Sequence, residues 1–416
     1  MAEYTTVGQL TGFFYEIYDK IVDPIPEMAK FMAKVPFKGG ALEIGNKLHV
    51  NVVVSDEGGF TYNTRDAGAF SVNPGVSFQT QDAQVDAFQL LLQGSVDYES
   101  AARASSSRKA FLELVGKKLQ VMVASTKRRY ESELWYGQST TILGLVESNT
   151  TPTIVITAAE YAPMLWQGKV GQSIQVWATD RTTSRGTWVI SSTNIAARSI
   201  TLASATTGIV ATDIITWAGS YGANLATPLT CAGVIKIASN TGTMFNINAV
   251  NYDVWGGNTI AVGAKKLTFA WVMQGLAVLA NRGLDGDCTL WVSPLTWATL
   301  VTDQAAFRKY QANVVRKFQN GAQAIEFSYM TGNVAIMGHG MVKQGYAVIT
   351  QDSKWKRIGA QDFSFKTPGL GEGRDIFWHA PANAGFNYRY YGAQSLFCEM
   401  PSHQLVFTGI DNASLT

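Results

Sequence analysis

Charged residues are scarce in this chain. Only 15% of its 416 residues are Asp, Glu, Lys or Arg, against about 25% in a typical soluble domain. Aromatic residues, by contrast, make up 11% of the chain. A monomer of this composition would expose much apolar surface to water, so the composition favours a protein that associates into a large assembly. The net charge of +2 is too small to predict nucleic-acid binding by itself.

Histidine and cysteine are also few, which argues against a metal site. Cys398 and His403 are close in sequence, but no second pair of ligands accompanies them, and a structural zinc ion needs four. Cys231, Cys288 and Cys398 are far apart and odd in number. We therefore expect reduced core cysteines in a cytoplasmic setting, and no metal or cofactor.

Catalytic and targeting motifs are missing as well. The chain has no G-x-S-x-G nucleophile elbow and no complete phosphate loop, because Gly168-Lys169 is followed by Val170, which has no hydroxyl group. Glycine-rich residues 369–373 include Glu372, whose carboxylate would repel phosphate, so we interpret them as a mobile loop. Together with the few histidines, this predicts that the chain is not an enzyme.

Segments that would direct the chain to a membrane are not found in the sequence. No run of 18 apolar residues occurs, so we expect no span across a membrane. The first twenty residues lack a basic stretch followed by an apolar core, so we do not expect a signal peptide.

A helix of unusual length is predicted between Ser107 and Gly137. Apolar residues recur there at three- and four-residue steps, which places them on one face: Leu112, Val115, Leu119, Met122, Tyr130 and Leu134. At 1.5 Å per residue the helix would be about 45 Å long. Residues 105–107 offer N-caps, and Gly137 is expected to end the helix in a left-handed conformation. We expect one side to pack on a sheet and the other to be basic and solvated.

The basic side of this helix carries the candidate functional residues. Five cations lie on it, and they are candidates for contact with the phosphates of DNA: Lys117, Lys118, Lys127, Arg128 and Arg129. They could bind phosphates in a salt-dependent way, without reading sequence. The alternative is a solvated face on which they pair with Glu113, Glu131 and Glu133. The sequence alone does not decide between the two.

β-type sequence lies on both sides of the helix. Strands at 48–54 and 84–92 flank a Gly-, Asn- and Pro-rich connection, which predicts a long two-stranded finger that leans on another chain. Residues 171–222 contain four strands at regular spacing, typical of a small sandwich or barrel. We expect its tryptophans, Trp177, Trp188 and Trp217, in the core of that unit rather than on a sugar-binding platform. After residue 234, strands alternate with helices.

Short apolar motifs follow these elements in a recognisable order. Trp135-Tyr136-Gly137 ends the long helix, residues 161–168 lead into the β segment, and residues 290–297 precede Phe307-Arg308-Lys309-Tyr310. Residues 321–327, 332–339 and 343–347 complete the series. This order resembles the major capsid proteins of tailed bacteriophages, which have the Hong Kong 97-type fold, and residues 161–168 resemble members with an inserted domain.

The resemblance implies an α+β subunit of five parts. They are an N-terminal arm (1–45), an extended β-hairpin loop (46–88), a peripheral domain with the spine helix (89–156 and 376–416), a small inserted all-β domain (157–224) and an axial domain (225–375). The resemblance also implies hexamers and pentamers that close into an icosahedral shell around double-stranded DNA, assembled in the cytoplasm of a bacterial host. The finger would lie over a neighbouring subunit, and portal, scaffold and cement proteins would be further partners.

Two other functions are considered. A nanocompartment shell protein of the same fold is one, although members of that group are usually shorter and lack an inserted β domain. The other is a carbohydrate-binding or carbohydrate-cleaving β protein, suggested by the Trp-rich strands. Exposure of Trp177, Trp188 and Trp217 would favour the carbohydrate function, and burial would remove its support.

Overall fold

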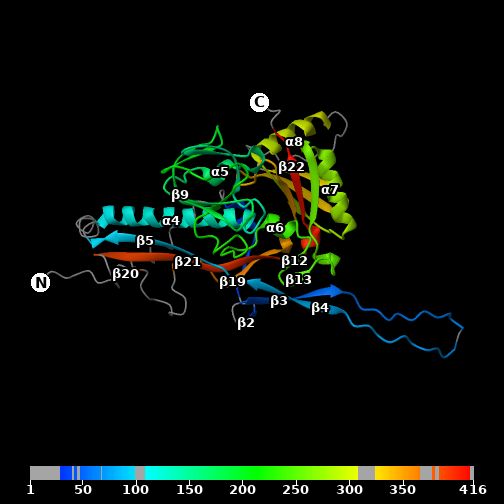
Figure 1. The fold of residues 1–416 in the computed structure, drawn as a ribbon. Helices are drawn as coiled ribbons and strands as arrows, with labels where there is room; N and C mark the ends of the chain where they lie inside the picture. The colour runs from blue at the N-terminus through cyan, green and yellow to red at the C-terminus, as the bar shows by residue number, and fades with distance from the viewer. Residues whose placement is uncertain are drawn as a thin grey trace.

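The computed structural model describes residues 29–39, 42–44, 47–66, 68–98, 108–307, 324–365, 377–379 and 384–412. The expected N-caps at 105–107 and the expected loop at 369–373 lie outside these ranges. Two sheets, a barrel and a projecting hairpin make up the described part (Figure 1). Among the described residues, no helix is long and apolar enough to cross a membrane.

The predicted long helix is present as α4, Arg108–Tyr136. It lies along a five-stranded sheet (Figure 1). The strand order is β1 (Phe37–Gly39), β19 (Trp355–Ser364), β21 (Gly385–Cys398) and β20 (Phe377–His379). The fifth strand, β5 (Gln89–Asp97), also pairs with β21. Leu119, Met122, Tyr130 and Leu134 are all buried, as their spacing predicts. The short helix α2 (Lys30–Lys34) packs against the same helix.

The end of α4 differs from the prediction. The residue with a left-handed backbone is Gln138, with φ of +58°, and not Gly137. Glycine at 137 allows a close approach of two backbone segments instead, because a Cβ there would collide with the backbone carbonyl of Cys231. The N–H of Gly233 donates to the carbonyl of Gly137 at 2.8 Å, which ties this segment and the following α6 (Val234–Ala238) to the end of the long helix.

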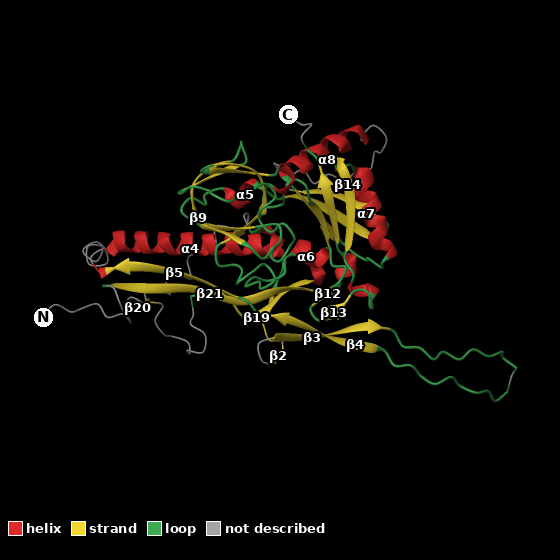
Figure 2. Ribbon diagram, viewed as in Figure 1, coloured by secondary structure: helices red, strands yellow, loops and turns green. Residues whose placement is uncertain are grey.

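The predicted finger is an antiparallel hairpin of β3 (Lys47–Ser55) and β4 (Gln79–Asp86), with β2 (Leu42–Ile44) at its edge. Residues 56–78, here called the hairpin tip, extend far from the body of the subunit (Figure 2). The predicted strand at 84–92 is divided between two strands, because β4 ends at Asp86 and β5, which belongs to another sheet, begins at Gln89.

A closed six-stranded barrel follows α4. Its order is β10-β7-β6-β11-β8-β9, and its strands are β6 (Gly144–Thr150), β7 (Thr153–Ile156), β8 (Ser173–Trp177), β9 (Ser184–Asn194), β10 (Ser199–Leu202) and β11 (Ile214–Trp217). The predicted domain boundary at residue 157 is wrong, because β6 and β7 close the barrel by pairing with β11 and β10. The loop between β7 and β8 contains η1 (Ala158–Glu160) and α5 (Pro163–Trp166).

The second sheet has six strands in the order β14-β22-β18-β15-β17-β16. They are β14 (Asn258–Lys265), β22 (Leu405–Ile410), β18 (Ala347–Thr350), β15 (Cys288–Val292), β17 (Gly332–Gly338) and β16 (Ala324–Tyr329). Helices α7 (Phe269–Asn281) and α8 (Pro294–Phe307) pack at this sheet (Figure 1), and Val272, Leu276 and Leu279 share a core cluster with its strands.

The predicted domain boundaries assign two strands to the wrong sheet. β19 falls within predicted axial residues 225–375 but pairs with β21 in the first sheet, and β22 falls within the predicted peripheral segment but pairs with β14 and β18 in the second. The chain therefore passes between the sheets more often than the boundaries assume. Short elements complete the described chain: β12 (Thr243–Met244), β13 (Ile247–Asn248), η2 (Asp253–Trp255), η3 (Asp352–Lys354) and η4 (Pro401–His403).

Candidate functional site

The hairpin tip presents large apolar side chains to solvent. Tyr62 is 91% exposed and Phe60 is 71% exposed, and Phe70, Val72 and Val76 are also exposed. Aromatic side chains are the residues that the buried centres of protein interfaces favour, and clustered exposure of this kind marks an interaction surface. The tip is therefore the first candidate surface for self-association.

Few hydrogen bonds hold the tip in shape. Gly58 and Val76 form an isolated antiparallel bridge, with N–H to carbonyl distances of 2.8 and 3.3 Å. Nearer the end, the Asn73 side chain donates to the Phe60 carbonyl at 2.9 Å, and the Asn73 N–H donates to the Thr61 hydroxyl at 2.8 Å. A two-stranded ribbon with so few cross-strand bonds gains stability when it rests on another surface.

The base of the hairpin, in contrast, is fixed to its own subunit. Leu48, Ala83 and Val85 are buried in the main core. The Gln84 N–H donates to the Phe245 carbonyl at 2.9 Å, which joins β4 to the loop between β12 and β13. The hairpin thus has a base that packs in the core and a tip that projects from it.

The five predicted cations of α4 do not form one solvated face. Lys118 is exposed, Lys127, Arg128 and Arg129 are half-buried, and the Lys117 side chain lies outside the described residues. Arg129 is covered by the barrel: its guanidinium carbon lies 4.2 Å from the centre of the Trp217 ring, and its Nε lies 3.3 Å from Glu133. Burial lowers the pKa of Arg129. The expectation of a wet basic side is wrong here, because the barrel packs on it.

One cation at this junction escaped the sequence analysis. Lys169, in the loop after α5, is only 3% exposed, and its Nζ lies 5.4 Å from the same Trp217 ring. Burial, together with the nearby Arg129 and Arg128 guanidinium groups, lowers the pKa of Lys169 to about 8. The signal in the sequence was Gly168-Lys169 itself, discounted because no hydroxyl follows it.

The depressed pKa of Lys169 predicts a pH dependence of stability. Below pH 8 the amine is protonated in both states. Between about pH 8 and its ordinary value of 10.5, the unfolded chain holds a proton that the folded chain has released, so the free energy of unfolding rises with pH. We expect a gain of up to about 3 kcal/mol across that interval.

Lys169→Met removes this titration and checks the expectation. Urea unfolding at pH 7.5 and pH 10 should show the rise in the wild type and a smaller rise in the variant. Lys265→Met, at an exposed lysine of β14, is the control and should behave as the wild type does. Parallel pH curves for the wild type and Lys169→Met would show that Lys169 titrates normally.

Glu131 and Glu133 of α4 are buried rather than on the predicted solvated side. Glu131 is fully buried, and its carboxylate accepts N–H groups of Phe31 at 3.0 Å and Met32 at 2.9 Å from α2. The Trp135 indole N–H donates to the same carboxylate at 3.2 Å, and Nε2 of the buried His339 lies 3.1 Å from it. The alternative in which Glu131 pairs with surface cations is therefore wrong.

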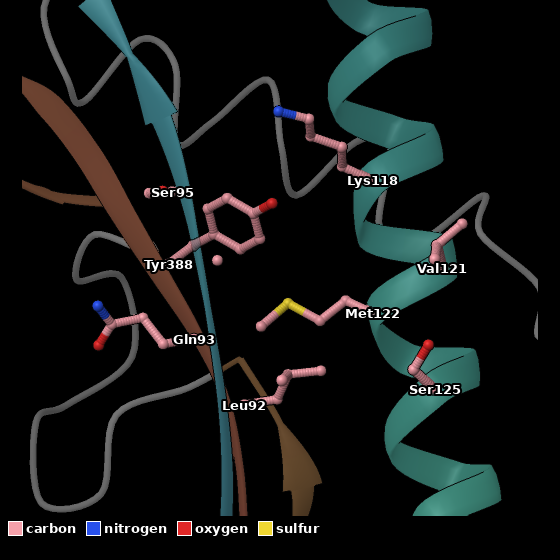
Figure 3. A pocket seen from close by; sticks show the side chains of 9 residues that line it. Leu92, Gln93, Ser95, Lys118, Val121, Met122, Ser125 and Tyr388 are labelled. Atoms are coloured by element: carbon pink, nitrogen blue, oxygen red, sulfur yellow. The ribbon is translucent and has the colours of Figure 1, made fainter. Parts of the chain in front are cut away.

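A cavity of about 470 Å³ lies between α4 and the strands β5 and β21 (Figure 3). Met122 and Val121 line it from the helix, Leu92 and Tyr388 from the strands, and Lys118 from one edge. It contains no pair of acid and base groups, and the described residues hold no cluster of three metal-ligating side chains.

The three indoles that bear on the carbohydrate function are buried. Trp177, Trp188 and Trp217 are 8% exposed or less. The Trp177 indole N–H donates to Thr216 at 3.1 Å, and the Trp217 indole N–H donates to Ser132 of α4 at 3.2 Å. The prediction that they form core is confirmed, and the carbohydrate function loses the observation that suggested it.

Neither a protein-family model nor a curated protein matches the chain. Among solved structures, the chain is similar to one titled as the capsid asymmetric unit of cyanophage A-1(L), with a TM-score of 0.51 and 11% identity over 94% of this chain and 96% of that one. Two more distant likenesses are the capsid of a native GTA particle (TM-score 0.46, 7% identity, 94% and 96% covered) and a structure from Mycobacterium phage Bobi (0.45, 10%, 98% and 99%). The first likeness spans nearly the whole of both chains and establishes the fold. The predicted α+β fold of the Hong Kong 97 capsid type is confirmed.

Proposed function

We propose that this chain is the major capsid protein of a tailed double-stranded DNA phage, and that it assembles with copies of itself into the icosahedral shell of the head. The observation that carries the proposal is the hairpin tip, a projecting ribbon with exposed aromatic side chains on a subunit of capsid fold. Its role is structural rather than catalytic. The protein then belongs to the virion and assembles in the cytoplasm of the bacterial host.

The hairpin suits a head-to-tail contact between subunits. A tip that projects from one subunit contacts a different surface on the next, and such heterologous contacts generate rings when the rotation closes. Rings of five and six subunits would supply the pentamers and hexamers of a shell. The low charged fraction of 15% agrees with a subunit that buries much of its surface against neighbours. Portal, scaffold and cement proteins are the further partners we propose.

Electron microscopy of the purified full-length chain tests the proposal. We expect closed shells, or rings of five and six subunits, at micromolar concentration. A protein that stays monomeric at every concentration and salt would refute it. Particles recovered from cells separate the phage head from a nanocompartment of the same fold: a head protects long double-stranded DNA from nuclease, whereas a nanocompartment does not.

Contact with packaged DNA is proposed for the cations of α4, namely Lys117, Lys118, Lys127, Arg128 and Arg129. Lys118 is the exposed one among the four whose side chains are described. Replacing it with Gln should reduce the dependence of duplex-DNA binding on salt by about one phosphate, or 0.9 in the slope of log K against log salt. Filter binding by assembled rings from 50 to 200 mM salt measures that slope.

The control for this prediction is Lys265→Gln, at an exposed lysine on β14. Its slope should equal that of the wild type if DNA contacts the α4 face. Equal slopes for Lys118→Gln and the wild type would mean that Lys118 does not face DNA.

A further inference from the structure

Three cations meet where α4 packs against the barrel. Arg129 and Lys169 lie over one indole, that of Trp217, at 4.2 and 5.4 Å from its ring centre. Arg128 lies beside the turn that carries Lys169, since its Nη1 is 3.9 Å from the position a Cβ of Gly168 would take. We call Arg128, Arg129 and Lys169 the cationic cluster.

The charges of this cluster are not balanced. The carboxylate that reaches it is Glu133, which pairs with Arg129 at 3.3 Å, so three cations meet one anion. Within the described part of the chain, neither the Lys169 ammonium group nor the Arg128 guanidinium group makes a hydrogen bond or an ion pair, and the Nε of Arg128 is buried without a partner. A buried charge without a partner is costly, and a bound anion would remove that cost.

The cluster lies beneath a surface turn. Gln167, Gly168 and Val170 are exposed, while Lys169 between them is folded inward against Trp217. Gly168 has φ of +71°, a conformation that a residue with a side chain rarely adopts, so the turn carries no side chain at the position beside Arg128 Nη1. A small anion can therefore reach the half-buried Arg128 guanidinium from the exposed turn.

We propose that Arg128, Arg129 and Lys169 form a binding site for a phosphate group. Guanidinium groups match phosphate oxygens with paired N–H donors, and an ammonium group adds a point charge at a third oxygen. A carboxylate has only two oxygens and would leave one of the three cations without a partner. The phosphate is either free inorganic phosphate or a phosphodiester of duplex DNA. The second source rests on the proposed capsid function, and the first does not.

Thermal unfolding of the full-length chain tests the site with inorganic phosphate as the probe. At pH 7 and matched ionic strength, phosphate should raise the unfolding temperature above its value in chloride, because a ligand that binds only the folded state stabilises it. Lys169→Met and Arg128→Gln should each weaken phosphate binding at least tenfold. Lys265→Met, at a distant exposed lysine, should leave the binding unchanged.

Circular dichroism confirms that each variant is folded before binding is measured. Lys169→Met removes a buried charge and keeps the length of the side chain, so it should not unfold the protein. No phosphate-specific rise in the wild type, or equal binding by the wild type and Lys169→Met, would overturn the site. The outcome is separate from shell formation: phosphate binding without shells refutes the capsid proposal alone, and shells without phosphate binding refute this site alone.

A 20-base-pair duplex, used in a second titration, identifies the source of the phosphate. A loss of duplex binding in Lys169→Met that parallels the loss of inorganic phosphate binding supports the site and assigns it to the DNA backbone. Duplex binding that is unchanged while inorganic phosphate binding is lost supports the site as one for free phosphate.

Discussion

Deletion of residues 56–73 from the hairpin tip should leave a subunit that folds but does not assemble. The deletion removes Phe60, Tyr62, Phe70 and Val72, whose exposed surfaces we expect to be buried in a neighbour. Residues 74–78 would then join Ser55 directly to Gln79, the two residues that face each other at the end of the β3–β4 ladder. A five-residue hairpin loop is common, so the base should keep its pairing.

The size of this effect follows from the apolar surface lost. Burying one large apolar side chain contributes about 1.5–3 kcal/mol, so losing four should weaken each subunit contact by at least about 4 kcal/mol. That is a factor of about a thousand in the association constant. Because each shell contains many such contacts, assembly at micromolar concentration should fail completely. Light scattering and electron microscopy measure assembly, and thermal unfolding measures the fold.

A double variant and a point variant separate loss of apolar contacts from loss of length. Phe60→Ser combined with Tyr62→Ser keeps the length of the tip and should reproduce most of the assembly defect. Arg65→Ser, an exposed polar position of the same tip, should assemble as the wild type does. Normal shells from the deletion variant would refute the idea that the tip joins subunits.

Local pattern was enough to predict the elements that the chain forms from neighbouring residues. Leu119, Met122, Tyr130 and Leu134 repeat at helical spacing, and the buried face of α4 is the face they share. Alternating strands around a polar connection gave the hairpin in the same way. In both cases the period of the sequence and the geometry of the backbone carry the information, and no distant contact is needed.

Features that depend on distant pairing were not predictable. Nothing in residues 144–156 shows that β6 pairs with β11, about seventy residues later, to close the barrel. The same barrel covers Arg129 and Lys169, so a basic helix face that looks solvated in sequence is partly buried. Glu131 was misread for a related reason, since two of its donors are backbone N–H groups about a hundred residues away and have no side-chain signature.

Replacement of Glu131 by Ala should be among the most destabilising single changes in this protein. It would leave the N–H groups of Phe31 and Met32 and the indole N–H of Trp135 buried without an acceptor. Each buried donor left unpaired costs about 1–3 kcal/mol, so we expect the three together to cost at least about 3 kcal/mol. Glu131→Gln should also destabilise the protein, because the glutamine amide nitrogen is a hydrogen-bond donor and would face the N–H groups that donate to the carboxylate.

The loss of structure in Glu131→Ala should begin at α2, because Glu131 holds α2 on α4. Phe31 lies 5.1 Å from Trp135 and 5.8 Å from both Trp291 and Trp355, ring centre to ring centre, so α2 inserts its aromatic side chain among three buried indoles. Without the carboxylate, that insertion must be maintained by apolar contact alone. Hydrogen exchange of the peptide covering residues 29–35 should accelerate at least a hundredfold.

Glu147→Ala is the control, because it removes a carboxylate that is partly exposed and paired with Arg198 at the surface at 2.7 Å. A surface ion pair contributes at most about 1 kcal/mol, so this variant should unfold nearly as the wild type does. If Glu131→Ala and Glu147→Ala cost the same, the buried carboxylate is not what holds α2. If exchange in residues 29–35 stays slow in Glu131→Ala, the contact between Phe31 and the three indoles is sufficient by itself.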